Sequence, residues 1–385
     1  PDAPTLHEDA PDNVVVDWDT GNEAAVEDAF AEADHVVSLD IRNQRILPTA
    51  MEPRSTIADY DAMDRKLTLT MATQTPHRNR DMMAKTLGLP ANRIRVVAPD
   101  VGGGFGSKGH HYPDQAVTAW CSMQLGRPVK WTARRRESLL ADTHGRNHDS
   151  HGELALDDEG NMLGLRVKSY VGLGGQLSTA GAGISCRYFG MTVSGVYDIP
   201  AAYCNVVGTF TNTAPVDAYR GAGRPESMFL IERLVHTAAR ELDMDPAELR
   251  RQNLVQPDQF PYENQLGLEY DSGDYEPVLD LALDHAGYED FRERQREARE
   301  EGRYLGLGVC LFVELSGNGP SGKDRKSDLP TLMESGVVRV HPTGAVTAYC
   351  GTADHGQGHA TTYAGFLSEQ LGVPEEQIEI IEGDT

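Results

Sequence analysis

Four glycines surround one phenylalanine in the stretch Gly102-Gly103-Gly104-Phe105-Gly106, which follows an apolar run and precedes Ser107-Lys108. Glycine lacks a Cβ atom and adopts positive φ readily, so this loop can point backbone N–H groups at an anion or a cofactor oxygen. Its spacing matches neither the phosphate loop Gly-x-x-x-x-Gly-Lys-Ser/Thr nor the dinucleotide loop Gly-x-Gly-x-x-Gly. A nicotinamide dehydrogenase would also need an acid suited to ribose, which is missing. A cofactor loop and a plain turn that lets a strand pass close to a helix both remain open.

Three further loops carry residue types that a cofactor site needs. Thr73–Thr75 contains Gln74. Ala218–Pro225 places Arg220 in a glycine-flanked turn before a helix, where its guanidinium could bind a carboxylate, carbonyl or phosphate. Gly351–His359 opens a helix whose free N–H groups and dipole favour an anion, and its Gln357 could donate to a cofactor oxygen. An exposed turn arginine and an ordinary helix cap are the simpler alternatives.

Metal ligation by this chain has weak support. His144, His148 and His151 have suitable spacing, but no Cys or carboxylate nearby completes a tetrahedral set. The five cysteines are odd in number and widely spaced. This pattern indicates neither a disulfide framework, nor a Cys-x-x-Cys site, nor an iron–sulfur cluster within the chain. We therefore expect no metal held directly by its side chains.

The chain has 385 residues, a formal net charge of −24 and seven lysines. Binding to nucleic acid depends on clustered Lys and Arg, so this composition argues against a nucleic-acid partner. A diffuse acidic surface with little lysine is typical of halophilic proteins, and an ordinary acidic cytoplasmic protein is the alternative. No apolar run of about eighteen residues and no secretion signal occur, so we expect a soluble, cytoplasmic protein without a membrane partner.

Apolar periodicity predicts an α/β fold of mixed α+β character, with helices over Asn22–Ala33, Pro76–Leu87, Asp114–Leu125 and Pro225–Leu242. Asn22 is expected to cap the first of these helices. Because the chain starts at Pro1, we expect it to be a piece of something longer. The predicted organisation is a lead-in over 1–20, a first unit over 21–255, a turn-rich connector over 256–274 and a second unit over 275–385, with a mobile loop over 316–335.

An internal repeat relates the two units. Leu-Gly-Leu-Pro precedes Arg-Ile-Arg-Val-Val-Ala-Pro-Asp in residues 82–101, and Leu-Gly-Val-Pro precedes Gln-Ile-Glu-Ile-Ile-Glu-Gly-Asp in residues 366–385. Each copy reads as helix, turn, strand and acid, with a glutamine upstream, Gln74 in the first and Gln357 in the second. The chain is therefore expected to hold two related units facing a shared site, the second of which stops before its own glycine loop.

Together these motifs resemble the molybdopterin-binding large subunit of the xanthine dehydrogenase/aldehyde oxidase family, most closely its carbon-monoxide-dehydrogenase-like branch. The resemblance spans nearly the whole chain and several motifs in the same order. They are Pro-Thr-Ala-Met-Glu-Pro-Arg (48–54), the Gln74 turn, Val-Ala-Pro-Asp-Val-Gly-Gly-Gly-Phe-Gly-Ser-Lys (97–108), Gly-Arg-Pro-Val-Lys-Trp (126–131), Ala-Tyr-Arg-Gly-Ala-Gly-Arg-Pro-Glu (218–226), Asp-Ser-Gly-Asp-Tyr (271–275) and Gly-Gln-Gly-His (356–359).

The resemblance implies roles for these residues. Gln74 would lie near the oxo ligand of molybdenum, the main chain at Gly104 and Phe105 would contact the cofactor, Gln357 would bind the pterin side and Arg220 would line the substrate pocket. The flanking glycines Gly103, Gly106, Gly356 and Gly358 would belong to the same cofactor loops. The implied cofactor is molybdopterin, as the cytosine dinucleotide, and the pterin rather than the protein would hold the metal.

The resemblance also implies hydroxylation of a small-molecule substrate with oxygen derived from water. Electrons would leave through a [2Fe-2S] small subunit and an FAD-binding medium subunit of a hetero-oligomer. Two departures narrow the substrate. Gly221 stands where members that oxidise carbon monoxide carry a cysteine, and Gly109 stands where purine-oxidising members carry a glutamate. An aldehyde or an N-heterocycle remains.

One expected group is missing from this sequence. The family's general base is a glutamate in a Gly-x-Gly-Glu-like segment, and no segment here matches it. The resemblance therefore implies that this chain supplies part of the cofactor cradle and leaves catalysis to be completed elsewhere. A non-catalytic remnant or scaffold is the alternative.

Overall fold

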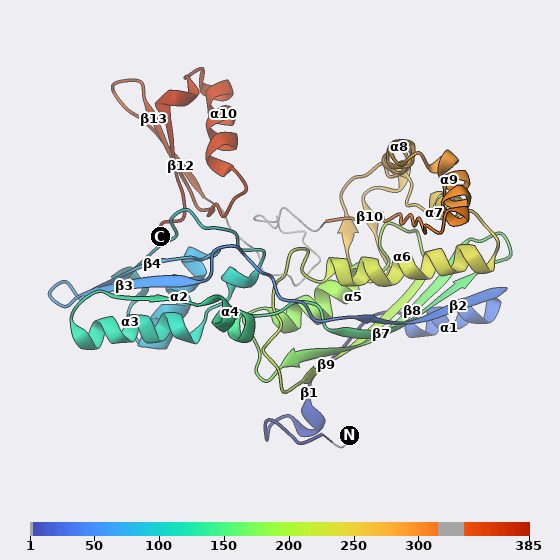
Figure 1. Cartoon of the computed structure of the whole chain (residues 1–385), viewed down its shortest axis with the longest axis horizontal. Coiled ribbons are helices and arrows are strands. Elements are labelled where there is room, and N and C mark those ends of the chain that lie inside the picture. Colours follow the sequence, from blue (N-terminus) through green and yellow to red (C-terminus); the bar gives the residue numbers. More distant parts are fainter. Residues whose placement is uncertain (1–2, 315–334) are drawn as a thin grey trace.

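The computed structural model describes residues 3–314 and 335–385, so the loop predicted over 316–335 lies almost wholly outside the described residues (Figure 1). Within the described ranges the strands form a five-stranded, a four-stranded and a three-stranded sheet and one short hairpin. None of the described helices is both long and apolar enough to span a bilayer. The expected mixed α/β class is confirmed.

The five-stranded sheet has the order β1-β9-β8-β7-β2, and only β8 and β9 run parallel. Its side chains alternate between two faces, of which one is covered by a long helix and the other only in part, since Lys168 and Tyr170 on it are exposed. Gly164 faces Ala29 and Phe30 of one helix, whereas Gly152 faces Leu230 and Leu234 of another. The elements are β1 (Val14–Gly21), α1 (Glu23–Glu32), β2 (His35–Asn43), β7 (His148–Leu156), β8 (Met162–Gly174), β9 (Ala201–Phe210) and α6 (Arg224–Glu241).

Helix α6 carries the main core of the molecule. Leu230, Leu234 and Ala238 follow helical spacing, are buried, and pack with Leu165 and Val167 of β8. A fully buried leucine contributes about 1.5–3 kcal/mol, so this stripe is sufficient to fix the helix on the sheet. The structure confirms the helices predicted over 22–33, 76–87, 114–125 and 225–242, and the Oδ1 of Asn22 caps the first by accepting from the Ala25 N–H.

The prediction for the first twenty residues was wrong. Residues 14–21 form β1, which pairs along its length with β9, so only the preceding segment is a lead-in. Val16 and Trp18 pack toward the core while Asp17 and Asp19 face outward. The acids hide the alternating pattern of an edge strand in a chain that is acidic throughout.

The four-stranded and three-stranded sheets contain the predicted repeat. In the first copy β3 pairs antiparallel with β4, which pairs parallel with β5 after helix α2; in the second, β12, β13, α10 and β14 repeat this order. A turn of Leu-Gly-x-Pro follows each helix. The elements are β3 (Ser55–Asp61), β4 (Lys66–Met71), α2 (Pro76–Leu87), β5 (Ile94–Val97), α3 (Pro113–Leu125), β6 (Val129–Thr132), α4 (Arg135–Ala141), β12 (Gly336–Val340), β13 (Val346–Cys350), α10 (His359–Leu371) and β14 (Ile378–Ile381).

The two repeat copies meet where β5 and β14 end. The Ala98 N–H donates to the Gly383 carbonyl at 2.7 Å and the Thr385 N–H to the Val96 carbonyl at 3.2 Å. Arg95 forms a bidentate ion pair with Asp384 beside these bonds. This contact places the two units next to each other, as Figure 1 shows.

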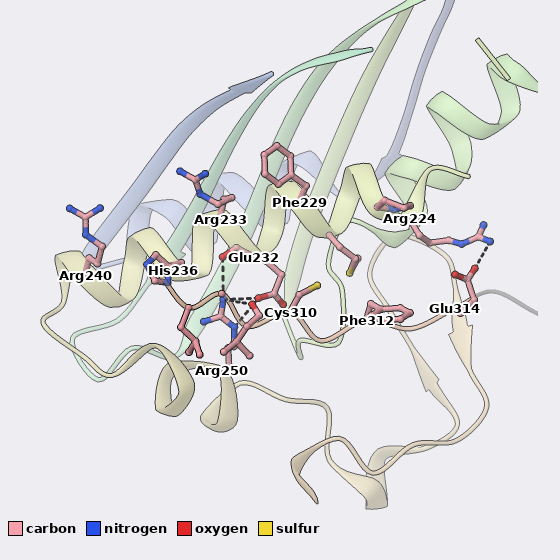
Figure 2. Close-up of a pocket in the computed structure, with 15 residues that line it drawn as sticks. Arg224, Phe229, Glu232, Arg233, His236, Arg240, Arg250, Cys310, Phe312 and Glu314 are labelled. Atoms are coloured by element: carbon pink, nitrogen blue, oxygen red, sulfur yellow. Dashed lines mark hydrogen bonds and ion pairs between the residues drawn. The ribbon is translucent and has the colours of Figure 1, made fainter. Parts of the chain in front are cut away.

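The segment between the repeats packs on α6, on the side away from the large sheet, as Figure 1 shows. Residues 256–274, predicted as a connector, contain a short hairpin, and Leu279 and Leu311 from the predicted second unit belong to the same core cluster as the buried residues of α6. A groove of about 710 Å³ runs along α6, lined by Phe229, Phe312 and the buried pair Arg250–Glu232 (Figure 2). The elements here are α5 (Phe189–Thr192), α7 (Pro246–Gln252), β10 (Tyr262–Glu263), β11 (Glu269–Tyr270), α8 (Glu276–Ala286) and α9 (Tyr288–Glu300).

His148 in β7 makes the fold sensitive to acid. Its ring is buried against Phe189, its Nδ1 lies 3.1 Å from Ser169 Oγ, and burial lowers its pKa from 6.5 to about 3. The unfolded chain therefore binds this proton between those pH values and the folded chain does not, so stability falls as the pH drops below 6.5. We expect His148 alone to lower the free energy of unfolding by about 2 kcal/mol between pH 6.5 and pH 5.

His148→Phe should remove this contribution while keeping a ring in the core. Urea unfolding at pH 7 and pH 5 measures it, with the exposed His151→Phe on the same strand as the control. The expected result is a smaller loss of stability on acidification in His148→Phe than in the wild type and control. Equal losses in all three proteins would show that His148 does not carry the effect.

Candidate functional site

Gln74 lies at the centre of the candidate site, between the end of β4 and the start of α2. Its side-chain Oε1 accepts hydrogen bonds from the backbone N–H of Gly106 at 2.9 Å and of Lys108 at 3.2 Å. The backbone N–H of Gln74 donates to the Lys108 carbonyl at 3.1 Å. A Cβ added at Gly104 would lie 2.4 Å from Gln74 Cδ. Glycine is required there because the loop wraps directly around the glutamine side chain.

An ion pair between the buried Lys108 and the partly exposed Glu52 closes the same loop from outside. Glu52 Oε2 accepts from the Gly102 N–H at 2.8 Å and from Lys108 Nζ at 2.6 Å, so one carboxylate oxygen holds both ends of the loop. Lys108 is 1% exposed, and burial lowers its pKa although Glu52 acts in the opposite direction. This pair was not predicted as part of the site, although Glu52 lies in the 48–54 motif.

The glycine loop contacts the arginine loop through backbone atoms. The Arg220 N–H donates to the Phe105 carbonyl at 3.0 Å, and a Cβ at Gly106, whose φ is +103°, would lie 2.3 Å from the Ala218 carbonyl oxygen. Arg146 supports this turn from below by donating to the Arg220 carbonyl at 2.8 Å and to Glu226 Oε1 at 3.2 Å. The Arg220 side chain is exposed and forms no ion pair within the described ranges, so it can meet a ligand.

The loop over 351–359 differs from its prediction in one respect. Two of its amides are already satisfied within the loop, because Asp354 Oδ1 accepts from the N–H groups of Gly356 at 2.9 Å and Gln357 at 2.7 Å, whereas the helix that begins at His359 has no side-chain cap. Desolvation disfavours the charged carboxylate, but these amide donors outweigh it and hold the pKa of Asp354 below its ordinary value. An aspartate two residues before a glycine forms such local turns readily, so the sequence did contain this signal.

The same loop reaches Gln74 through His355. His355 Nε2 lies 3.2 Å from Gln74 Nε2 and 3.1 Å from Gln357 Nε2. Gln357 folds back on its own loop, where its Oε1 accepts from the His355 N–H at 2.7 Å. All four predicted loops are thus joined in one network, with Gln74 in contact with the glycine loop and with the second unit.

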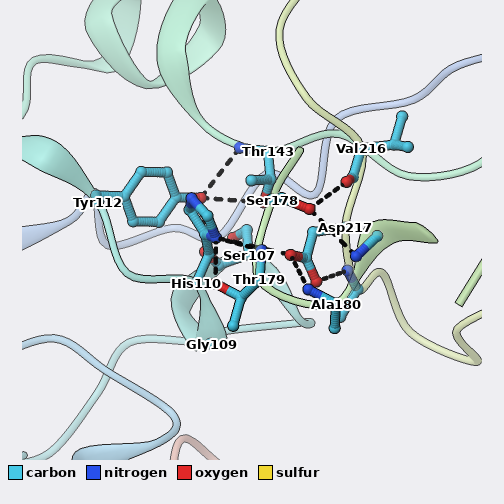
Figure 3. Close-up of polar contacts among 12 residues, drawn as sticks. Ser107, Gly109, His110, Tyr112, Thr143, Ser178, Thr179, Ala180, Val216 and Asp217 are labelled. Carbon is cyan, nitrogen blue, oxygen red and sulfur yellow. Dashed lines mark hydrogen bonds and ion pairs between the residues drawn. The ribbon is translucent and has the colours of Figure 1, made fainter. Parts of the chain in front are cut away.

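A polar cluster beneath the loops holds the arginine loop in place (Figure 3). His110 Nδ1 lies 2.6 Å from Thr179 Oγ1, and Asp217 accepts from the N–H groups of Ala180 at 3.0 Å and Ala218 at 2.6 Å. Tyr112 donates to the Ser107 carbonyl at 2.7 Å, and burial raises the pKa of its hydroxyl to about 12, so it stays a donor. The groove along α6 begins where the arginine loop ends, since Arg224 and Pro225 line it, but neither Gln74, Arg220, the glycine loop nor the loop over 351–359 lines it.

The structure separates the histidines whose spacing suggested a metal site. No group of three His, Cys, Asp or Glu suited to a metal ion occurs among residues 3–314 and 335–385. His148 is buried beside Ser169, whereas His151 contacts Asp40 at the surface. The three loop histidines therefore do not converge on one point.

The arrangement fits an oxygen-rich cofactor bound largely by main chain. Within the described residues, the N–H groups of Gly104 and Phe105 donate to no acceptor, although they lie in the middle of the pinned loop. Phe105 holds a positive φ of 52°, a conformation that is uncommon outside glycine and often marks functional sites. These two N–H donors, a loop made mostly of glycine and the fixed amide of Gln74 supply the groups such a cofactor needs.

Comparisons with known proteins agree with this geometry. The model of the molybdopterin cofactor-binding domain matches residues 6–254, and a second such model matches residues 281–385. The chain belongs to the molybdopterin-binding large-subunit family of xanthine and carbon monoxide dehydrogenases. Members of this family are molybdopterin-dependent oxidoreductases.

Several relatives of this family cover almost the whole chain. The carbon monoxide dehydrogenase large chain of Hydrogenophaga pseudoflava is 38% identical over 100% of this chain and 50% of its own length. The nicotine 6-hydroxylase large subunit of Paenarthrobacter nicotinovorans is 35% identical over 99% of this chain and 46% of its own. The structure of quinoline 2-oxidoreductase from Pseudomonas putida 86 matches with a TM-score of 0.90 at 36% identity, and the match covers 97% of this chain and 47% of that one. The chain thus spans about half the length of these relatives.

Gly106 provides a test of how the two central loops fit together. In Gly106→Ala the new methyl group would collide with the Ala218 carbonyl, so the glycine loop must separate from the arginine loop. We expect a loss of about 2–4 kcal/mol in unfolding free energy, combining the clash with the strained φ. Gly88→Ala is the matched control, because Gly88 also has a positive φ but has no atom within 4 Å of the added Cβ. Equal effects of the two substitutions on urea unfolding would contradict the proposed fit.

Proposed function

We propose that this chain forms the molybdenum-cofactor cradle of a hydroxylase that oxidises an N-heterocycle, or alternatively an aldehyde, with oxygen from water. The observation that supports it most directly is the network around Gln74, which brings loops from both repeat copies to one point. In this proposal the glycine loop at Gly103–Gly106 and the loop at Gly356–Gly358 contact the cofactor, Gln74 donates to one of its oxygens and Arg220 lines the substrate pocket.

The bound cofactor would supply Lewis-acid and redox chemistry, and the chain's own residues would position the reactants. Gln74 would donate its side-chain N–H to a cofactor oxygen, since its Oε1 is already occupied by Gly106 and Lys108. Arg220 would orient an electron-rich atom of the substrate, because its guanidinium is exposed beside the glycine loop. The N-heterocycle is preferred because relatives at 35% and 36% identity are named for nicotine and quinoline.

We further propose that the chain works in a hetero-oligomer with an FAD-binding medium subunit and a [2Fe-2S] small subunit. The names of its relatives, a large chain, a large subunit and a complex subunit gamma, support this. We also propose the cytosine dinucleotide form of the cofactor and a cytoplasmic location. Flavin and iron–sulfur absorbance in material purified through a tag on this chain, and the nucleotide released by acid, test the first two proposals. Cell fractionation tests the third.

Metal and pterin content test the proposed function directly. The complex purified from its native host should contain molybdenum in proportion to this chain, measured by mass spectrometry, and should release a fluorescent oxidised pterin. An intact complex that contains neither would contradict the proposal and favour a scaffold without catalytic function.

Arg220 is expected to govern substrate binding more than cofactor binding. In Arg220→Ala the KM for an N-heterocycle should rise at least about tenfold, because a charge-assisted contact is lost, while molybdenum content stays unchanged. Arg220→Lys should recover part of the loss, and Arg42→Ala on β2 serves as a control. Steady-state rates with an artificial electron acceptor give these values. An unchanged KM in Arg220→Ala would show that Arg220 does not bind the substrate.

A further inference from the structure

His355 connects the two repeat copies through a pair of glutamines. Gln74 comes from the turn after β4 in the first copy, and Gln357 comes from the corresponding loop after β13 in the second. The Nε2 atoms of both glutamines lie within 3.2 Å of His355 Nε2. None of the roles discussed above requires a histidine at this position.

The direction of each hydrogen bond follows from the surrounding groups. Gln74 Oε1 accepts two backbone N–H groups, so the atom that faces His355 must be the amide nitrogen, which only donates. His355 Nε2 must therefore be an unprotonated acceptor. His355 Nδ1 lies 2.8 Å from the Ala353 carbonyl, which only accepts, so Nδ1 carries the proton. The structure thus selects one neutral tautomer of this histidine.

The environment of His355 favours the neutral ring. Desolvation by burial lowers the pKa of His355 from its ordinary value of 6.5. Among the charged groups around it, Asp354 acts in the opposite direction, whereas His359 and Lys108 act in the same direction as burial. A protonated His355 would direct an N–H at the N–H groups of Gln74, and the bridge would be lost.

The amide nitrogen of Gln74 has two N–H groups, and His355 accepts only one of them. We propose that His355 is a positioning residue that fixes the Gln74 amide so that its second N–H points at an oxygen of the bound molybdenum cofactor. This inference rests on the proposed function of the site. It assigns to His355 an indirect role: the histidine touches the glutamine, and the glutamine touches the cofactor.

Two substitutions separate this role from simple packing. His355→Leu fills similar space but offers no acceptor, whereas His355→Gln keeps an acceptor oxygen that does not titrate. The control is His341→Leu, since His341 contacts Thr347 at the far end of the β12–β13 hairpin. Each variant is purified as the full complex, and the molybdenum and pterin retained after dialysis are measured between pH 8 and pH 5.5.

We expect the wild type and His341→Leu to lose cofactor faster as the pH falls. His355→Leu should lose it about five- to tenfold faster at pH 8, the effect of one missing hydrogen bond. His355→Gln should retain it at pH 8 and lose the dependence on pH. If the wild type and His355→Leu retain the same amount of molybdenum and pterin at pH 8, the inference is overturned. If the wild type contains no molybdenum at all, the proposed function is overturned instead.

A measurement on the unaltered protein covers the case in which the variants do not fold. Deuterium exchange at the imidazole C2 position, followed by mass spectrometry of the peptide containing His355, reports the pKa of this ring in the intact complex. The expected pKa is below 6.5. A ring that is protonated at pH 7 cannot accept from Gln74 and would overturn the inference.

Discussion

The side-chain carbonyl of Gln74 is the group on which the rest of the site depends. It accepts two backbone N–H groups of the glycine loop, so the loop is built around the glutamine. Gly104 then has no room for a side chain, and Gly106 is pressed against the arginine loop. Glu52 fixes the outer ends of the same loop through the Gly102 amide and the Lys108 ammonium. Because the loop is fixed from both sides, it can hold the N–H groups of Gly104 and Phe105, which have no acceptor among the described residues, in a defined position.

Duplication gives this site its second side. Two copies of the same strand–helix–strand unit meet where β5 and β14 end, and the loop that follows the middle strand of each copy carries the glutamine. The contact between Arg95 and Asp384 lies on the surface, where an ion pair contributes little stability. The backbone bonds beside it and the bridge through His355 therefore matter more for how the copies are aligned.

The sequence predicts the parts of this site that depend on local pattern. The repeat, the helices and the four loops follow from apolar periodicity, proline and glycine positions within about twenty residues. The pair Glu52–Lys108 and the bridge Gln74–His355 join residues 56 and 281 positions apart, and no local pattern encodes such pairing. The strand β1 was missed because acids occupy its outer face. The hydrogen bonds of Asp354 to Gly356 and Gln357 are different, because they join neighbouring residues and the Asp-x-Gly pattern does encode them.

The glycine loop offers backbone groups to a ligand, whereas the arginine loop offers a side chain. The backbone N–H groups of the glycine loop do not depend on side-chain type, but the loop conformation has no space for a Cβ at Gly104 and Gly106, so glycine is required at these positions. Arg220 offers a side chain from a turn whose backbone is fixed by Phe105, Arg146 and Asp217. In the proposed function, a substitution of the exposed Arg220 side chain would change what faces a substrate while the backbone of the turn stays fixed. Gly221 is less tolerant, because its φ is +95° and an added Cβ would lie 2.3 Å from Pro225 Cγ. Relatives named for carbon monoxide, nicotine and quinoline align over almost the whole chain, which is the outcome expected when substrate choice lies in such exposed tips and the cradle is retained.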